Sequence, residues 1–373
     1  MKRNQLIIAV CGLALSLLAG CGRKAYENPI ATNSQQPDKI LFDKAINDLE
    51  KQHYDLTRLT LNTLLNTYPD TEYAAKAQLA IADSWYREGT RHALAQAEAV
   101  YKDFQTFFPT MEEASESQMK VCQIHYDQMH SADRDQTHVR RADQECRQML
   151  MQNPNSRHAD GTRQLLREVQ EVLADGEFEV GAFYAFKGSY RAASNRLQAV
   201  TDHYPLFSRS DEALWTLADT YSNMGDEYVD QRADALSRLV RDYPLSQYLD
   251  QAKQELVAMN RPVPEADPAR FELMQYNVAN RTKKSIYGKM FGFFGTGPNV
   301  RNAAKAGDPI MNALVPTTPT GVGQTRIEGA GGSAGVTVET VTDESKLDTE
   351  PDARRGAQQT EPENKEESNE QQK

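Results

Sequence analysis

The sequence lacks most of the motifs that mark enzymes and nucleic-acid-binding proteins. It contains no glycine-rich phosphate loop, no Gly-x-Ser-x-Gly elbow and no His-Glu-x-x-His motif. Its 53 acidic residues outnumber 42 lysines and arginines, for a formal net charge of -11, whereas nucleic acid favours a basic face. Alternating β-branched runs between tight turns are also missing. We therefore expect a helical protein that is not an enzyme, needs no cofactor and does not bind nucleic acid.

Long apolar runs are scarce, and the only extended one lies at the N-terminus. Residues 6–19 follow Met1-Lys2-Arg3 and are too few to span a bilayer comfortably. No later run approaches the roughly 20 apolar residues that a spanning helix needs. This pattern predicts a signal peptide over residues 1–20 and a mature chain that does not cross the membrane.

Cysteine is also scarce, with four in the chain, and one of them follows this apolar run. Leu18-Ala19-Gly20-Cys21 resembles the bacterial lipobox. The resemblance implies that Cys21 is diacylated on sulfur, becomes the new N-terminus and is then N-acylated; three acyl chains exceed the two signals that stable anchoring needs. Gly22 stands where an Asp would suggest inner-membrane retention, which points to the outer membrane. The alternative is an ordinary secretory signal with an incidental cysteine.

Composition divides the mature chain into four segments. Residues 21–37 are polar and read as a flexible tether. Residues 38–258 are rich in Ala, Leu, Gln, Arg and Tyr, a helical composition. Residues 259–295 open with helix-breaking prolines and are expected to be partly helical, with a helix from Pro268 to about Tyr287. Residues 296–373 end in an acidic, weakly apolar stretch and are predicted to be disordered.

An aromatic or polar residue followed by proline recurs through the helical segment. Self-similarity at spacings of 40, 45, 51 and 39 residues indicates an array of helix pairs, with each proline ending a helix. A Ser or Thr often follows, as Thr71 and Ser246 do, and can cap the next helix. The recurring pairs are Tyr68-Pro69, Phe108-Pro109, Asn153-Pro154, Tyr204-Pro205 and Tyr243-Pro244.

The sharpest unit resembles the tetratricopeptide repeat. Gly181 and Ala193 are the small residues that let two antiparallel helices approach, and Gly188 makes the turn between them. The resemblance implies an all-α, right-handed solenoid of about five such helix pairs, more than the three or so that a stable stack needs. The signature positions in this unit are Gly181, Tyr184, Gly188, Tyr190, Ala193, Leu197 and Pro205.

Lipobox, polar tether and repeats together resemble the BamD family, the outer-membrane lipoproteins of the β-barrel assembly machinery. Two local matches narrow the resemblance: an Asp-Arg-Asp loop within residues 131–136, and residues 179–197 with an Asn-Arg pair. The family implies an adaptor lipid-anchored at the periplasmic face of the outer membrane. Its implied partners are a BamA-like barrel-forming protein, other assembly-complex lipoproteins and unfolded outer-membrane proteins. Scaffolding of other envelope or division proteins, or a periplasmic enzyme with an unrecognised site, are the alternatives.

The two local matches supply the candidate partner contacts. The loop offers Asp133, Arg134 and Asp135, although Asp135 is equally suited to capping a helix. The second match offers Asn195 and Arg196, because the guanidinium fork suits interfaces. An internal salt bridge is the competing role for Arg196.

Cys122 and Cys146, with His125, His130 and His138 nearby, form a group with the ligand types that zinc prefers. The repeat frame instead places Cys122, His125 and Cys146 at helix-packing positions, so no metal site is expected. A disulfide between Cys122 and Cys146 is the other candidate, because both would lie on neighbouring helices in an oxidising compartment. The sequence does not set the distance between their Cα atoms.

Overall fold

A computed structural model describes residues 36–282 and 297–312. Every regular element in these two ranges is a helix, which confirms the all-α fold class. The predicted signal peptide, Cys21 and most of the tether lie outside the described residues, as does the chain after residue 312.

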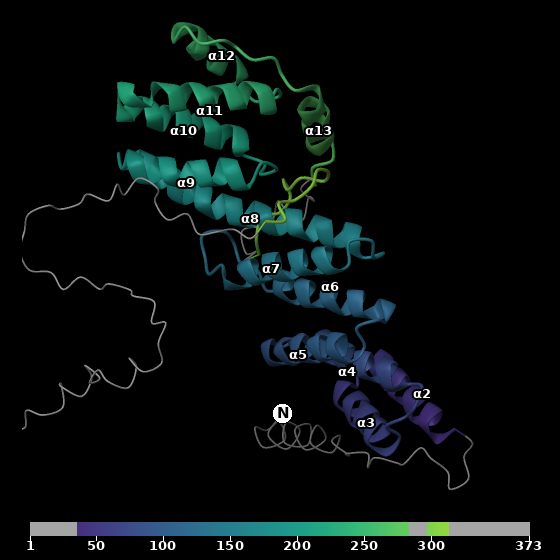
Figure 1. Ribbon diagram of the computed structural model, residues 1–373. Coiled ribbons are helices and arrows are strands. Elements are labelled where there is room, and N and C mark those ends of the chain that lie inside the picture. The colour runs from purple at the N-terminus through teal and green to yellow at the C-terminus, as the bar shows by residue number, and fades with distance from the viewer. Residues whose placement is uncertain (1–35, 283–296, 313–373) are drawn as a thin grey trace, which may run out of the picture. The chain divides into compact units, whose positions relative to one another are not determined.

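Ten of the helices form five consecutive pairs, and each helix packs against the next one along the chain (Figure 1). This arrangement confirms the tetratricopeptide-like array, while its right-handedness stays a prediction. The pairs are α2 (Pro37–Glu50) with α3 (Tyr54–Thr67), α4 (Ala74–Glu88) with α5 (Arg91–Phe107), α6 (Glu112–Asp127) with α7 (Thr137–Gln152), α8 (Ala159–Phe186) with α9 (Tyr190–His203), and α10 (Ser210–Met224) with α11 (Val229–Asp242). A short 3-10 turn, η1 (Asp226–Tyr228), precedes α11. Two further helices, α12 (Leu249–Ala258) and α13 (Pro268–Ala279), follow α11.

The second helix of every pair ends in the same way, immediately before a proline. The C-cap residues have φ between -132° and -128° and ψ between 52° and 69°, and each still donates its N–H to the carbonyl four residues earlier. The proline disfavours the helical conformation for the residue before it, so the helix stops there. The prediction that these prolines terminate helices is confirmed at Tyr68, Phe108, Asn153, Tyr204 and Tyr243.

The hydroxyl residues after these prolines do not cap the next helix in the expected way. The N-caps of α4 and α12 are Tyr73 and Tyr248, and neither has a side-chain cap. Thr71 and Ser246 instead accept hydrogen bonds from the N–H groups of Tyr73 and Tyr248, at 3.3 and 3.1 Å. They therefore shape the turn that leads into the helix, and the capping prediction is wrong for both residues.

Helix α8 has 28 residues, twice the length of its partner α9. Between Pro154 and Gly188 the sequence has no proline to interrupt it, which accounts for the longest of the repeat spacings. Gln170, midway along α8, donates to Asp143 on α7 at 3.4 Å, whereas Gly181, near its end, lies against Leu197 on α9. One helix thus joins the third and fourth pairs of the array.

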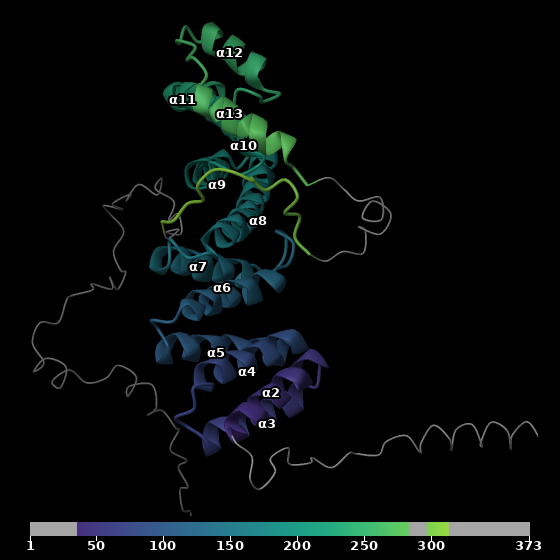
Figure 2. The ribbon, with the colours of Figure 1, turned by 90° about the vertical axis from the view of Figure 1, so that its right-hand side faces the viewer.

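The C-terminal region differs from prediction in two places. Helix α13 ends at Ala279, eight residues before the expected Tyr287. Residues 297–312, which were expected to be disordered with the rest of 296–373, form an extended segment that crosses α8; we call it the strap (Figure 2). Ala303 and Ala304 are buried there. The expectation of disorder rested on the acidic, weakly apolar stretch at the end of the chain, and the hydrogen bonds that dock residues 297–312 are made mainly by their backbone.

Candidate functional site

The crossing of α8 and α9 is unusually close at Gly181. A Cβ atom placed on Gly181 would lie 2.9 Å from Cγ of Leu197 and 3.3 Å from Cβ of Arg196. Its nearest neighbours are therefore Leu197 and Arg196, one turn beyond the expected Ala193. Gly188 has φ +73° and makes the turn between the helices. Ala193 and Leu197 are fully buried, and Tyr184, Tyr190 and Pro205 are half-buried.

The Asp-Arg-Asp loop before α7 is exposed and internally bonded. Asp135 accepts hydrogen bonds from the N–H and the hydroxyl of Thr137, at 3.0 and 2.7 Å, which lower the pKa of its carboxyl. The hydroxyl of Ser131 donates to Asp133 and lowers the pKa of that carboxyl. Asp135 thus bonds the start of α7, as a capping residue would. Within the described ranges Arg134 takes part in none of the salt bridges.

The loop docks on α8 beside the second candidate pair. Gln136 donates to the carbonyl of Ala132 at 3.0 Å, and a Cβ atom on Gly176 would lie 2.2 Å from Nε2 of Gln136. The next residue of α8, Glu177, accepts from Arg196 on α9 at 2.6 Å. The loop and Arg196 therefore contact consecutive residues of α8, Gly176 and Glu177.

Arg196 has an internal partner, as the alternative interpretation required. Its side chain is 44% exposed and that of Glu177 is 26% exposed, so the ion pair lies largely in solvent. An exposed pair of this kind contributes at most about 1 kcal/mol to the free energy of unfolding. Arg196 therefore remains accessible to a partner carboxylate, while Asn195 is half-buried beside it.

A further charged residue in contact with α8 is Arg209, the N-cap residue of α10. It was not predicted from the sequence. Its guanidinium lies 3.1 Å from Asp175, 2.7 Å from Glu179 and 2.8 Å from Glu212, and 4.2 Å from the centre of the Phe178 ring. Burial opposes the charge, but the bonds to Glu212 and Glu179 raise the pKa of Arg209 above its ordinary value. No sequence signal could reveal this network, because three of its members lie about 30 residues before Arg209.

Exposed apolar side chains continue this surface to the end of α8. Val180 is 41% exposed, Phe183 56% and Phe186 85%, and the ammonium of Lys187 lies 5.6 Å from the Phe183 ring centre. Exposed aromatic residues beside charged groups are typical of protein interfaces. We refer to the Asp-Arg-Asp loop, the exposed side chains of Glu179, Val180, Phe183 and Phe186, and the Asn195-Arg196 pair as the central α8 surface.

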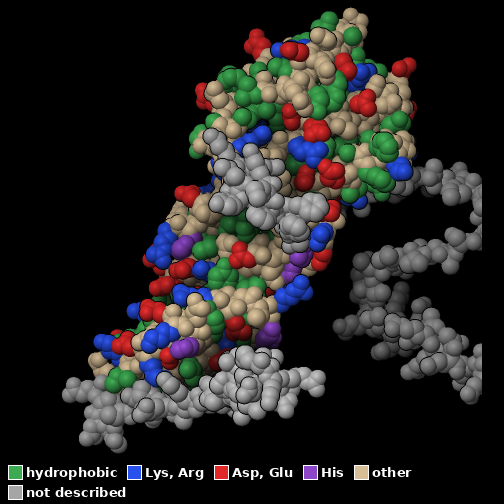
Figure 3. Space-filling view, turned by 180° about the vertical axis from the view of Figure 1, so that it is seen from behind, with side chains coloured by type: hydrophobic (Ala, Val, Ile, Leu, Met, Phe, Trp, Pro, Cys, Tyr) green, Lys and Arg blue, Asp and Glu red, His purple; other side chains and the backbone are tan. Residues whose placement is uncertain are grey.

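Charge is mixed over the rest of the described chain. Acidic and basic side chains are interspersed over the face shown in Figure 3, and no continuous basic area stands out among the described residues on that face. This distribution is unlike the basic stripe by which nucleic-acid-binding proteins neutralise phosphate.

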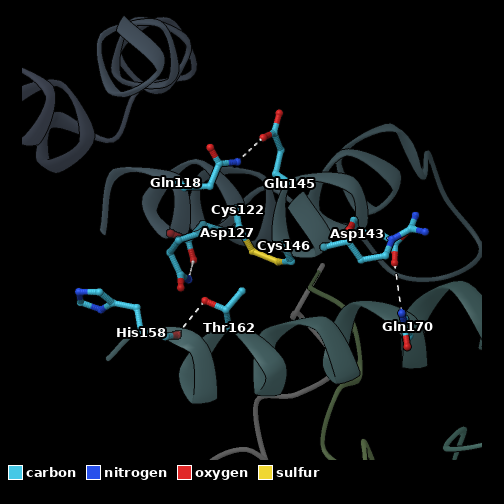
Figure 4. Close-up of a disulfide and its surroundings, with 11 residues drawn as sticks. Gln118, Cys122, Asp127, Asp143, Glu145, Cys146, His158, Thr162 and Gln170 are labelled. Atoms are coloured by element: carbon cyan, nitrogen blue, oxygen red, sulfur yellow. Dashed lines mark hydrogen bonds and ion pairs between the residues drawn. A yellow bond between two sulfur atoms is a disulfide. The ribbon is translucent and has the colours of Figure 1, made fainter. Parts of the chain in front are cut away.

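A disulfide joins α6 and α7 between Cys122 and Cys146 (Figure 4). Their Cα atoms are 5.0 Å apart, within the usual range for a disulfide, and both residues are fully buried. Nearby, Gln118 of α6 donates to Glu145 of α7 at 2.9 Å, so a polar contact accompanies the covalent one. With their sulfur atoms bonded to each other, these cysteines are not available as metal ligands.

One cluster in the described ranges has metal-ligand types: Glu98, His125 and Glu145. The ammonium of Lys102 already bridges the two carboxylates, at 2.8 Å from each. Burial lowers the pKa of His125, whose Nδ1 lies 3.3 Å from Nδ1 of His138. Lysine therefore occupies the place between the carboxylates that a cation would take, and the arrangement reads as an internal ion-pair network.

No helix in residues 36–282 and 297–312 has both the length and the apolar character to cross a membrane. Comparison with known proteins gives a consistent set of relatives. The sequence model of the family YfiO, described as outer membrane lipoprotein, matches residues 34–236. The match covers α2 to the middle of α11, including the central α8 surface, and leaves out α12, α13 and the strap.

Several curated proteins named outer membrane protein assembly factor BamD are similar over most of the array. The protein from Neisseria meningitidis serogroup A is 26% identical over 264 residues, 68% of this chain and 96% of its own. The protein from Rickettsia prowazekii is 24% identical over 252 residues, 68% of this chain and 96% of its own. The protein from Caulobacter vibrioides is 24% identical over 223 residues, 60% of this chain and 72% of its own.

Proposed function

Because the chain belongs to the YfiO, or BamD, family of outer membrane lipoproteins, we propose that it is a lipid-anchored scaffold for the assembly of outer-membrane β-barrel proteins. The family match over the helical array is the observation that carries this proposal. The shared name of the relatives from three distant bacteria supports the same role. The scaffold works by binding and is not a catalyst.

The central α8 surface is where we place the main partner contact. It combines exposed aromatic side chains, Phe183 and Phe186, with charged groups, and it lies within the family match. Arg134 contributes an exposed guanidinium to it. Partners contacting such a surface bury the aromatic rings and pair with the charges at its rim. We expect a BamA-like barrel-forming subunit to dock here, with other assembly-complex lipoproteins and unfolded outer-membrane proteins binding to the same scaffold.

A pull-down from detergent-extracted membranes tests this proposal. Wild-type protein should capture a barrel-forming outer-membrane protein, and Phe183→Ala should capture much less of it. Phe107→Ala is the matched control, because Phe107 is an exposed aromatic residue at the end of α5, away from the central α8 surface. Capture of other envelope or division proteins, with no barrel-forming protein among them, would contradict the proposed role.

Arg196→Ala separates the two roles of that residue. If Arg196 contacts a desolvated partner carboxylate, affinity for the purified periplasmic domains of the barrel-forming subunit should fall about tenfold or more. If it serves only the pair with Glu177, affinity should stay unchanged and unfolding should become easier by no more than about 1 kcal/mol. Measuring affinity and melting temperature on the same variant, with Glu177→Ala beside it, distinguishes the outcomes.

Anchoring through Cys21 at the periplasmic face of the outer membrane is part of the proposal. Cys21→Ala should leave the precursor uncleaved by the lipoprotein peptidase and without acyl groups. Intact-mass spectrometry of membrane-extracted protein measures both effects. A wild-type mature chain that starts elsewhere and carries no acyl mass would refute the anchor.

A further inference from the structure

Most hydrogen bonds between the strap and the helices are made by the main chain of the strap. Gln170, on α8, both donates to the carbonyl of Ile310 at 2.7 Å and accepts from its N–H at 3.1 Å. Asn277, on α13, accepts from the N–H groups of Lys305 and Ala306 and donates to the carbonyl of Ala306. Further carbonyls of the strap accept hydrogen bonds at Ala304 from Gln164, at Gly307 from Arg167 and at Asn312 from Arg147.

Apolar side chains of the strap also contribute to its docking, since Val300 and Met311 pack against buried core clusters. Its buried residues are small or cyclic: Ala303, Ala304 and Pro309. One side-chain ion pair accompanies them, from Lys305 to Glu168 at 3.1 Å. Recognition through main-chain bonds accepts many sequences, with selectivity left to a few side-chain positions. We call the side chains of Arg147, Gln164, Arg167, Gln170 and Asn277 the strap groove.

One position of the strap has a strict steric requirement. Gly307 has φ +98°, and a Cβ atom there would lie 2.8 Å from Cδ2 of Leu206. Both the backbone conformation and the contact exclude larger residues. Gly297, in the same segment, has nothing within 4 Å of an added Cβ atom. The two glycines therefore provide one substitution that should release the strap and one that should not.

We propose that the strap groove is a binding site for an extended segment of another polypeptide, and that the strap is its built-in competitor. The kind of polypeptide that would bind can be inferred from the chemistry of the groove. Its five amide and guanidinium side chains form hydrogen bonds with peptide N–H and C=O groups that have no other partner. A folded protein has already paired nearly all of those groups internally, whereas an unfolded chain presents them. The identity of the occupant rests on the proposed function. We assign it as a segment of an unfolded outer-membrane protein, with small residues at the positions that Ala303 and Ala304 take in the strap.

Covalent attachment makes the strap an effective competitor. A tethered segment meets its site at an effective concentration in the millimolar range, so a separate chain binds weakly while the strap is docked. The strap contains no helix or strand and its larger apolar side chains are only partly buried, so it can open at a lower free-energy cost than the helical array. An incoming chain that makes the same main-chain bonds over a longer stretch can therefore replace it.

The first test uses a fluorescein-labelled peptide of residues 299–312 and the full-length protein in detergent. Gly307→Val should bind this peptide at least about tenfold more tightly than wild type, because its own strap is released. Gly297→Val should bind it as wild type does. Adding Gln170→Ala to Gly307→Val should abolish the gain. If the strap of Gly307→Val is released, shown by faster amide exchange at Lys305, Ala306 and Ile310, and the peptide still does not bind, the groove is not a separable site and the proposal fails.

The second test needs no variant and identifies the occupant. A urea-unfolded outer-membrane barrel protein, diluted into wild-type protein, should speed amide exchange at the same three strap residues, and it should displace the labelled peptide from Gly307→Val. If the peptide binds but the unfolded barrel protein has neither effect, the assignment of the occupant is overturned. Co-purification of a barrel-forming subunit in that case would still support the proposed function, so the two failures are distinguishable.

Discussion

At the residue scale, Gly181 sets how closely α8 and α9 approach. The space where its Cβ atom would lie is already filled by Leu197, which is fully buried and cannot rotate into solvent. Gly161 lies on the same helix with nothing within 4 Å of its Cβ position. Substitutions at Gly181 and Gly161 therefore distinguish the steric requirement for glycine at the crossing from the low helix propensity of glycine.

Gly181→Leu should lower the free energy of unfolding by about 1–3 kcal/mol, because the added side chain overpacks the crossing. Gly161→Leu should leave it unchanged or raise it by up to about 1 kcal/mol, because leucine favours helix over glycine. Urea denaturation of both variants measures the difference. Equal changes in the free energy of unfolding at the two positions would contradict a close approach of α8 and α9 at Gly181.

Glu171, buried in α8, is the other residue with a distinct physical signature. Burial raises the pKa of its carboxyl to about 7, against the opposing effect of two hydrogen bonds from Ser208; Asp175 raises it further and Arg281 lowers it. The folded protein thus holds a proton on Glu171 at pH values where the unfolded chain has lost it. Stability from this group is present below about pH 4.5 and declines as pH rises toward 7.

Wild-type protein should therefore lose stability between pH 5 and pH 8, at about 1.4 kcal/mol for each pKa unit of difference between the folded and unfolded states. Glu171→Gln is uncharged at every pH and should flatten that part of the profile. Denaturant midpoints at four pH values within this range measure both proteins. Parallel profiles would show that Glu171 titrates at an ordinary pKa.

At the element scale, the five helix pairs share the same helix end, but one pair also has a covalent link between its two helices. Each second helix stops at its proline with the same backbone conformation, so the turns are local products of sequence. Helices α6 and α7 have an additional covalent link through Cys122 and Cys146, 24 residues apart in the chain. In the unfolded chain this link closes a loop and removes conformational entropy, which favours the folded state.

Replacing both cysteines with alanine should lower the free energy of unfolding by about 3 kcal/mol, the loop-closure value for a loop of this length. Dithiothreitol should destabilise wild-type protein toward the same value and leave the double variant unaffected. Thermal or urea unfolding with and without reductant measures this. Identical stability of oxidised wild type and the double variant would show that the link does not constrain the unfolded chain.

At the scale of the whole molecule, the strap connects parts of the chain that are far apart in sequence. It bonds to Arg147 on α7, to four side chains of α8 and to Asn277 on α13. The strap and Asn277 lie outside the family match, which ends at residue 236, whereas the contacting side chains of α7 and α8 lie within it. The segment after the array is thus partly integrated with it.

Two truncations measure that integration. Deleting residues 296–373 should lower the melting temperature by several degrees, because the hydrogen bonds and the burial of Ala303 and Ala304 are lost. Deleting residues 313–373 keeps the strap and should leave the melting temperature unchanged. Equal melting temperatures for both truncations and the full chain would show that the strap adds no stability.

The sequence by itself determined the features that depend on local interactions and periodicity. Proline positions set the helix ends, the recurring residue-proline pairs predicted an array of helix pairs, and Gly188 marked a turn that needs a positive φ. For the candidate site, the resemblance to family motifs offered the Asp-Arg-Asp loop and the Asn195-Arg196 pair as possible partner contacts. Each of these signals is contained within a short stretch of chain.

Only the tertiary structure decided which distant residues meet. It placed Gly181 against Leu197 where Ala193 was expected, paired Arg196 with Glu177, and surrounded Arg209 with carboxylates from α8 and α10. It also docked residues 297–312, whose composition predicted disorder, because their bonds are made by backbone groups that every residue type shares. Hydrogen bonds of that kind do not depend on side-chain type, so they cannot be predicted from a pattern of side chains.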